Sequence, residues 1–135
     1  MKKSLVLIKP DAVKKNVIGK IISKYEDSGL KVIALKMQTI SEGFASIHYG
    51  EHKGKSFYDE LIRFITSAPL CALILEGDNV IERVREINGS TDPKVAKEGS
   101  IRSLYATNKT QNAVHASDSE ESAKREIKLW FGENY

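Results

Sequence analysis

The chain has 135 residues, of which 41% are hydrophobic and 29% are charged, with one cysteine and a formal net charge of +3. This size predicts a single domain over residues 1–135 whose core needs no covalent cross-link, and one cysteine excludes both an internal disulfide and a cysteine-based zinc site. No apolar run is long enough for a transmembrane helix or a signal peptide, and the cysteine usage suits a reducing compartment, so we expect a cytoplasmic protein.

The first part of the chain predicts a strand, a helix and a second strand. Residues 4–8 are a short, β-branched apolar run that ends before Pro10, which is typical of a buried strand. Apolar residues then recur at helical spacing over 17–25, and Gly29 marks the end of that helix. The run 30–40 predicts a long second strand.

The middle of the chain predicts helices on either side of a third strand. Ser41 is a helix-start residue, and a second helical stretch is predicted over 56–65. The run 70–75 is apolar at every position, so it predicts a strand buried on both faces and makes Cys71 an inert thiol. Residues 79–87 have the spacing of an amphipathic helix.

The last part of the chain predicts a long loop, a short strand and a final helix. Residues 90–112 lack apolar periodicity, and loops of this length in compact domains are usually functional or disordered. Residues 113–115 predict a short strand, and the acids and serines of 117–121 predict a helix start. The buried side of this helix is expected to consist of Ile127, Trp130 and Phe131.

The order of these elements indicates the fold class. Two β-α-β halves of this kind predict a split β-α-β arrangement, in which helices pack on a four-stranded antiparallel sheet. We therefore expect an α+β protein with a ferredoxin-like α/β sandwich.

Two of the three histidines are spaced as in half of a zinc site. His48 and His52 lie four residues apart and would share one face of a helix. Gly50 weakens such a helix, and no glutamate directly follows the first histidine as in zinc proteases. We therefore expect His48 to be a partly buried structural residue rather than a metal ligand.

His115 is the stronger candidate for chemistry. It precedes a predicted helix N-terminus, where free backbone N–H groups attract anions. Ser117 is within local hydrogen-bonding range, and Glu126 lies about two turns into the following helix. A carboxylate behind one ring nitrogen makes the other nitrogen more nucleophilic. On these residues alone, His115 is either an activated nucleophile or a buried histidine satisfied by its neighbours.

Several other residues have the chemistry of an anion site. Lys9 follows the first strand, Arg85 belongs to the predicted helix 79–87, and Thr91, Arg102 and Asn112 belong to the long loop. Arginine presents a rigid fork to phosphate oxygens, and threonine and asparagine add neutral donors. Each basic residue also has an ordinary alternative as a surface ion-pair partner. Because the chain has no glycine-rich phosphate loop, side chains would have to hold any nucleotide.

Three segments then resemble a known family. The stretches IKPDAV (8–13), TDP (91–93) with GSIR (99–102), and NAVHASDS (112–119) closely resemble the signature segments of nucleoside diphosphate kinases. The similarity runs from Leu5 to Phe131 in the order and spacing of the family, and the histidine segment is highly specific.

The resemblance implies a ping-pong phosphoryl transfer. His115 would take the γ-phosphate of a triphosphate such as ATP or GTP and pass it to a different nucleoside diphosphate. Ser117 and Glu126 would orient the imidazole, with Glu126 on the nitrogen opposite the phosphorylated one. A base stacked on Phe57 makes no demand on its hydrogen-bonding edge, so broad base specificity would follow. The residues that would surround the phosphates and ribose are Lys9, which is also counted as catalytic, Tyr49, His52, Arg85, Thr91, Arg102 and Asn112.

The resemblance also implies the remaining partners. Mg²⁺ would arrive on the nucleotide's phosphates, so no protein metal ligand is expected, and the protein would be a homo-oligomer, either a tetramer or a hexamer. Several positions depart from the family pattern without removing a proposed catalytic group. They are Ala68 and Ala116 in place of glycines, Glu98 in place of a proline, Gln111 in place of an arginine, and Ser103-Leu-Tyr105 in place of Gly-Asp-Phe.

Two other functions compete with this one. Residues 1–36 contain nine lysines and three acids, which suits a non-catalytic nucleotide- or nucleic-acid-binding module on the same scaffold. The chain lacks the aromatic-rich strand pair of such RNA-binding modules, so we do not expect nucleic acid as a partner. A metal hydrolase at His48 and His52 would require tightly bound zinc.

Overall fold

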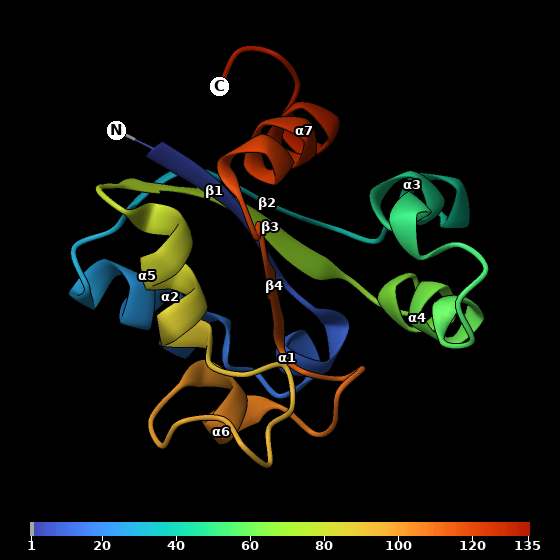
Figure 1. Ribbon diagram of the computed structural model, residues 1–135, viewed down its shortest axis with the longest axis horizontal. Coiled ribbons are helices and arrows are strands. Elements are labelled where there is room, and N and C mark those ends of the chain that lie inside the picture. The colour runs from blue at the N-terminus through green and yellow to red at the C-terminus, as the bar shows by residue number, and fades with distance from the viewer. Residues whose placement is uncertain (1) are drawn as a thin grey trace.

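A four-stranded antiparallel sheet with the strand order β2-β3-β1-β4 forms the centre of the computed structural model, which describes residues 2–135 (Figure 1). Helices cover both faces of the sheet, as expected for the ferredoxin-like sandwich. The elements are β1 (Lys2–Ile8), α1 (Pro10–Lys14), α2 (Ile18–Asp27), β2 (Lys31–Gln38), α3 (Glu42–His48), the 3₁₀ helix η1 (Gly50–His52), α4 (Tyr58–Ile65), β3 (Leu70–Gly77), α5 (Val80–Asn88), α6 (Ile101–Tyr105), β4 (Val114–Ala116) and α7 (Glu120–Phe131).

The two central strands are apolar on both faces because each face has its own core. Along β1, Val6 and Ile8 belong to a buried cluster with α2 and α5, whereas Leu5 and Leu7 belong to a second cluster with α4 and α7. Successive residues of β3 alternate between the same two clusters. The prediction that 70–75 is a strand buried on both faces is therefore confirmed, and Cys71 is a buried free thiol.

Two predicted helix starts are confirmed by their caps. The Ser41 hydroxyl accepts a hydrogen bond from the Phe44 N–H at 3.1 Å and begins α3. The Ser119 hydroxyl caps α7 in the same way, accepting from the Ser122 N–H at 3.0 Å. Of the apolar residues assigned to the buried side of α7, Phe131 is only half-buried.

Other expectations were wrong. Pro10 does not only end β1: it begins α1 at a position where its missing N–H costs no hydrogen bond. The segment 90–112 is not entirely loop, because it contains the five residues of α6, capped by Ser100. Helices α1 and α6 have five residues each, which is too short for a periodic apolar pattern. The strand predicted at 113–115 starts one residue later, because Ala113 has a φ of 73°.

No helix among residues 2–135 has the length and hydropathy needed to cross a membrane.

Candidate functional site

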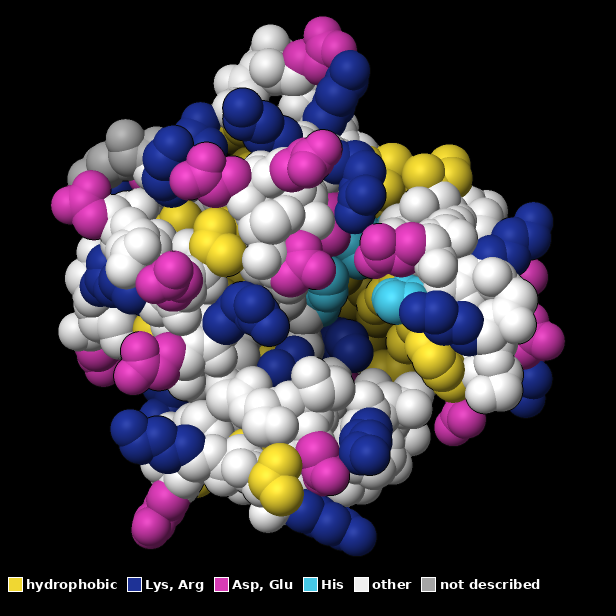
Figure 2. All heavy atoms as spheres, in the orientation of Figure 1, with side chains coloured by type: hydrophobic (Ala, Val, Ile, Leu, Met, Phe, Trp, Pro, Cys, Tyr) yellow, Lys and Arg dark blue, Asp and Glu magenta, His cyan; other side chains and the backbone are white. Residues whose placement is uncertain are grey.

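A cleft of about 1210 Å³ separates the hairpin of α3 and α4 from α5 and the segment that follows it. Figure 2 shows histidine and basic side chains gathered where this surface is hollowed. Ser117 is the one predicted site residue that does not line the cleft. The predicted residues that line it are Lys9, Tyr49, His52, Phe57, Arg85, Thr91, Arg102, Asn112, His115 and Glu126.

Strand pairing places His115 at the wall of the cleft. It lies opposite Leu7 in the β1–β4 ladder, and its Nε2 is 3.1 Å from Glu126 Oε1. A carboxylate only accepts hydrogen bonds, so the Nε2 atom of His115 must carry the donated proton. The other ring nitrogen, Nδ1, has no hydrogen-bond partner within residues 2–135 and is left with a free lone pair.

Ser117 lies behind this pair rather than beside the imidazole. Its hydroxyl donates to Glu126 Oε1 at 2.7 Å and accepts from the Leu5 N–H at 3.1 Å. Burial alone raises the pKa of Glu126, but the hydrogen bond from His115, its charge and the hydrogen bond from Ser117 outweigh burial and hold that pKa below its usual value. Ser117 therefore acts on the histidine only through an ionised Glu126.

Lys9 is a buried cation next to the cleft. Its Nζ donates to Asn112 Oδ1 at 2.8 Å. The pKa of Lys9 is lowered to about 8, mainly by burial and also by the charge of Arg102, with Asp11 opposing both. The main chain fixes this arrangement, because the Lys9 N–H donates to the Ala113 carbonyl at 2.8 Å and Asp11 Oδ2 accepts from the Ala113 N–H at 3.0 Å. Sequence reasoning missed Asp11, although it belongs to the IKPDAV segment.

Arg102 connects three separate parts of the main chain. Its guanidinium donates to the carbonyls of Gly89 and Val114, both at 2.8 Å, and of Asn112 at 3.3 Å. Burial lowers its pKa, and nearby Arg85 adds to this effect. Arg102 therefore lines the cleft and also fixes the ends of the segment that carries Asn112.

The hairpin of α3, η1 and α4 supplies the aromatic wall. Tyr49 is buried, and its hydroxyl has no partner within residues 2–135. Burial raises the pKa of Tyr49, so the hydroxyl keeps its proton as a donor. His52 lies against Phe57 with ring centroids 5.5 Å apart, and Phe57 is 42% exposed. Arg85 and Thr91 face the same cleft from exposed positions.

His48 was expected to be partly buried, but it is buried. Its ring contacts His115, with centroids 4.8 Å apart, and its Nδ1 accepts a hydrogen bond from the Trp130 indole at 3.0 Å. No signal in the sequence links His48 to His115, because the contact joins α3 to β4, which are distant along the chain.

The residues do not form a ready-made Mg²⁺ cage. Within residues 2–135, the one group of three metal-ligand side chains whose donor atoms lie within 4.8 Å of one another is His48, His115 and Glu126. His48 is hydrogen-bonded to Trp130, and His115 and Glu126 to each other. Mg²⁺ prefers oxygen ligands and retained water, so this nitrogen-rich, buried group does not suit it.

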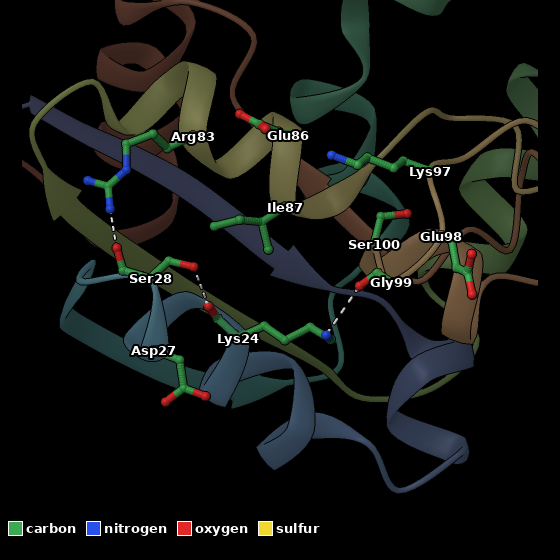
Figure 3. A pocket seen from close by; sticks show the side chains of 10 residues that line it. All are labelled: Lys24, Asp27, Ser28, Arg83, Glu86, Ile87, Lys97, Glu98, Gly99 and Ser100. Atoms are coloured by element: carbon green, nitrogen blue, oxygen red, sulfur yellow. Dashed lines mark hydrogen bonds between the residues drawn. The ribbon is translucent and has the colours of Figure 1, made fainter.

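A second hollow, of about 550 Å³, lies between α2, α5 and residues 97–100 (Figure 3). Its two best-placed cations are already engaged with main-chain carbonyls. Lys24 Nζ donates to Gly99 at 3.2 Å, and Arg83 donates to Asp78 at 3.0 Å and to Ser28. No histidine lines this hollow, so the first cleft is the candidate site.

The sequence is similar to known proteins over nearly its whole length. The sequence model of the family described as "Nucleoside diphosphate kinase" matches residues 2–135. A protein named nucleoside diphosphate kinase from Clostridium perfringens (strain SM101 / Type A) is 55% identical over 131 residues, which are 97% of this chain and 92% of that protein. One of the same name from Sulfurisphaera tokodaii is 51% identical over 98% of this chain and 90% of its own length.

Solved structures of proteins with the same name are also similar to this one. The nucleoside diphosphate kinase of Aquifex aeolicus superposes with a TM-score of 0.93 at 42% identity, covering 96% of this chain and 94% of that one. That of Encephalitozoon cuniculi superposes with a TM-score of 0.97 at 32% identity, covering 99% and 91%.

Proposed function

The chain belongs to the nucleoside diphosphate kinase family and is thus a phosphotransferase that moves the γ-phosphate of a nucleoside triphosphate to a nucleoside diphosphate, and we propose that His115 carries the phosphate between them. The observation that carries this proposal is the asymmetry of the imidazole. Its Nε2 is bound by Glu126 at 3.1 Å, whereas Nδ1 has a free lone pair at the cleft.

The transfer then takes two balanced steps. In the first, the Nδ1 lone pair attacks the γ-phosphorus, and the bond to the bridging oxygen breaks so that the diphosphate leaves with that electron pair. Positive charge develops on the imidazole, and the Glu126 carboxylate offsets it through Nε2–H. In the second step, a terminal oxygen of another diphosphate attacks the phosphorus, and the N–P bond breaks to restore His115.

The phosphates are held by the cleft's cations and neutral donors. Phosphoryl transfer requires positioning and charge neutralisation, and Lys9, Arg85 and Arg102 supply three positive charges. The buried hydroxyl of Tyr49 is a donor that a phosphate oxygen would satisfy. The proposed set of phosphate and ribose contacts is Lys9, Tyr49, His52, Arg85, Thr91, Arg102 and Asn112.

Magnesium is proposed to enter with the nucleotide. The donor set of the cleft offers no oxygen cage, so the nucleotide's own phosphates would bind the ion. When bound there, Mg²⁺ neutralises phosphate charge.

A pulse-chase experiment tests the proposed function. Brief incubation with γ-labelled ATP and Mg²⁺ should place an acid-labile, base-stable label on the protein, and an unlabelled diphosphate should then remove it as triphosphate. Omission of Mg²⁺ with a chelator should prevent labelling. A module that only binds nucleotides would remain unlabelled, and this outcome would refute the proposal.

Base recognition is proposed to rest on stacking against Phe57. Its exposed ring at the cleft suits any base, because every base has a π-face. We expect Phe57→Ala to raise the KM for ATP and GTP by about tenfold, because base stacking contributes about 1–3 kcal/mol. The kcat should change little, because the base is remote from the reacting atoms. Steady-state assays should show near-normal KM values for the Phe57→Tyr control, and an equal loss in both variants would contradict stacking.

Deprotonation of Lys9 should lower the rate of the reaction at alkaline pH. Its pKa is lowered to about 8, so the free protein loses this charge as the pH rises through that value. We expect kcat/KM for histidine phosphorylation to fall above about pH 8, because that parameter reports the pKa of the free enzyme. Bound phosphate favours the charged lysine, so kcat should fall at a higher pH.

Stopped-flow profiles of Lys9→Arg provide the control for this limit. Arginine stays charged throughout, so the variant should lose the alkaline limb whatever its absolute rate. If the decrease in kcat/KM at alkaline pH persists in Lys9→Arg, a group other than Lys9 causes it.

The protein is also proposed to be a cytoplasmic homo-oligomer, a tetramer or a hexamer. Strand β2 is an edge of the sheet, and Leu35 and Met37 on it are 55% and 53% exposed, which suits a subunit contact. Sedimentation equilibrium would distinguish these states from a monomer. The buried free thiol of Cys71 suits a reducing compartment, and cell fractionation would test the location.

A further inference from the structure

His48 is a buried polar side chain to which the proposed reaction assigns no role. It ends α3, is buried, and meets three aromatic rings edge to face. The centroid of Tyr49 lies 4.6 Å away, that of His115 4.8 Å and that of Trp130 5.5 Å, with interplanar angles of 89°, 77° and 83°. One of these rings is the proposed nucleophile.

Trp130 fixes the orientation of the His48 ring. The indole N–H can only donate, and it does so to His48 Nδ1 at 3.0 Å. A neutral His48 must therefore carry its proton on Nε2, which selects one tautomer and one ring orientation. Trp130 is itself buried, and its ring centroid lies 4.7 Å from that of Phe44.

Burial and the surrounding charges keep His48 neutral. The pKa of His48 is lowered to about 3, mainly by burial and also by His115, Arg125 and Lys9, whereas Glu126 opposes them. The ring is therefore uncharged when the kinase works near neutral pH. It can pack against His115 without competing for the Glu126 carboxylate and without placing a second cation beside the nucleophile.

The geometry leaves one degree of freedom that Glu126 does not control. A hydrogen bond to Nε2 fixes the position of that atom, but the imidazole can still tilt and rotate about the contact. A rigid ring packed against the imidazole removes this motion, and misplacement of a reacting atom by about 1 Å costs roughly 100-fold in rate.

We propose that His48, held by Trp130, is a positioning residue that keeps the Nδ1 atom of His115 aimed at the phosphate. The inference rests on the proposed role of His115 as the phosphate carrier. Glu126 anchors one edge of the nucleophile, and His48 supports the ring from the side.

The test compares His48→Ala with Phe44→Ala as a matched control. Both side chains lie on α3 and contact Trp130, but only His48 touches His115.

In single-turnover reactions with γ-labelled ATP, we expect His48→Ala to phosphorylate His115 at least about tenfold more slowly than the wild type. The dissociation constant for ATP should stay within about twofold, because no proposed phosphate contact is removed. Phe44→Ala should lose similar thermal stability and keep its rate within about twofold. Equal rates in the two variants would overturn the proposal.

A second measurement keeps the proposal testable if His48→Ala fails to fold. Trp130→Phe keeps a ring but removes the donor to His48, and should slow phosphorylation about threefold or more; an unchanged rate would contradict the proposal. Nitrogen-15 NMR of labelled histidines should show His48 and His115 each as a single Nε2–H tautomer in the wild type. In Trp130→Phe, His48 should become a mixture of tautomers, whereas His115 keeps its Nε2–H through Glu126. An unlabelled wild-type protein, or a labelled His115→Ala, would instead refute the underlying role of His115.

Discussion

Replacing His115 with alanine is expected to abolish the phosphoenzyme and to lower kcat by a factor on the order of 10⁴ or more. The remaining groups of the cleft can position a nucleotide, but none can replace the nucleophile. His48 is buried with its Nδ1 occupied by Trp130, and His52 lies on η1 with its Nδ1 3.3 Å from Lys55. Label incorporation and a coupled steady-state assay measure both effects.

The fold should survive this substitution. His115 has a side chain that is 22% exposed, and its loss leaves Glu126 with the hydrogen bond from Ser117. We expect unfolding to become easier by about 1–2 kcal/mol, since one hydrogen bond to a charged group is removed. His115→Asn is the control, because asparagine retains an amide donor but cannot carry the phosphate. Label in either variant would show that another residue is the nucleophile.

Replacing Lys9 with methionine is expected to have opposite effects on activity and stability. Removing one fixed donor from a site of developing charge costs about 10²–10³-fold in rate, so phosphorylation of His115 should slow by this factor. The lowering of the Lys9 pKa from 10.5 to about 8 corresponds to about 3 kcal/mol of lost stability while the lysine is charged in both folded and unfolded states. Methionine fills similar space without charge, so we expect the variant to be more stable by about 1–3 kcal/mol at neutral pH.

The stability gain expected for Lys9→Met depends on pH. Below about pH 8 the lysine is charged in both states, so its full penalty applies. As the pH rises from about 8 towards 10.5, the folded state loses its proton first and the penalty decreases. Urea unfolding should therefore show a stability gain for Lys9→Met at pH 7 that becomes small near pH 10. A gain that is constant with pH would mean that packing, not charge, explains it.

Lys15→Met is the matched control for the loss of activity. Lys15 also donates to oxygens of the long segment, to the Tyr105 carbonyl at 2.6 Å and to Thr107 Oγ1 at 2.9 Å, but it is exposed and does not line the cleft. Its substitution should leave the phosphorylation rate within about twofold. A comparable loss in both variants would mean that net charge, rather than the position of Lys9, matters.

The elements that the sequence predicted well are those with a strong local signal. The run 70–75 is buried on both faces because each strand face has its own core, and Ser41 caps a helix where its hydroxyl can reach the Phe44 N–H. Local chemistry is enough for both. It is not enough for α1 and α6, whose five residues each are shorter than the pattern that would reveal them.

The candidate site could be predicted only in part. Residue types and the resemblance selected ten residues that line one cleft, but the roles assigned to them stay predictions. The sequence could not show that the Ser117 hydroxyl contacts Glu126, that Arg102 binds three carbonyls, or that His48 lies against His115. These contacts depend on tertiary packing between elements that are distant along the chain.

The pairing of β1 with β4 has a consequence for the order in which the enzyme is made. Lys9 is synthesised long before its partner Asn112, the proposed nucleophile His115 on β4 and the Glu126 carboxylate on α7. Strand β1 can pair with β3 long before β4 exists. A nascent chain can thus bury much of its core before it contains the proposed phosphate carrier, so we expect catalytic activity to begin only after β4 and α7 have been made.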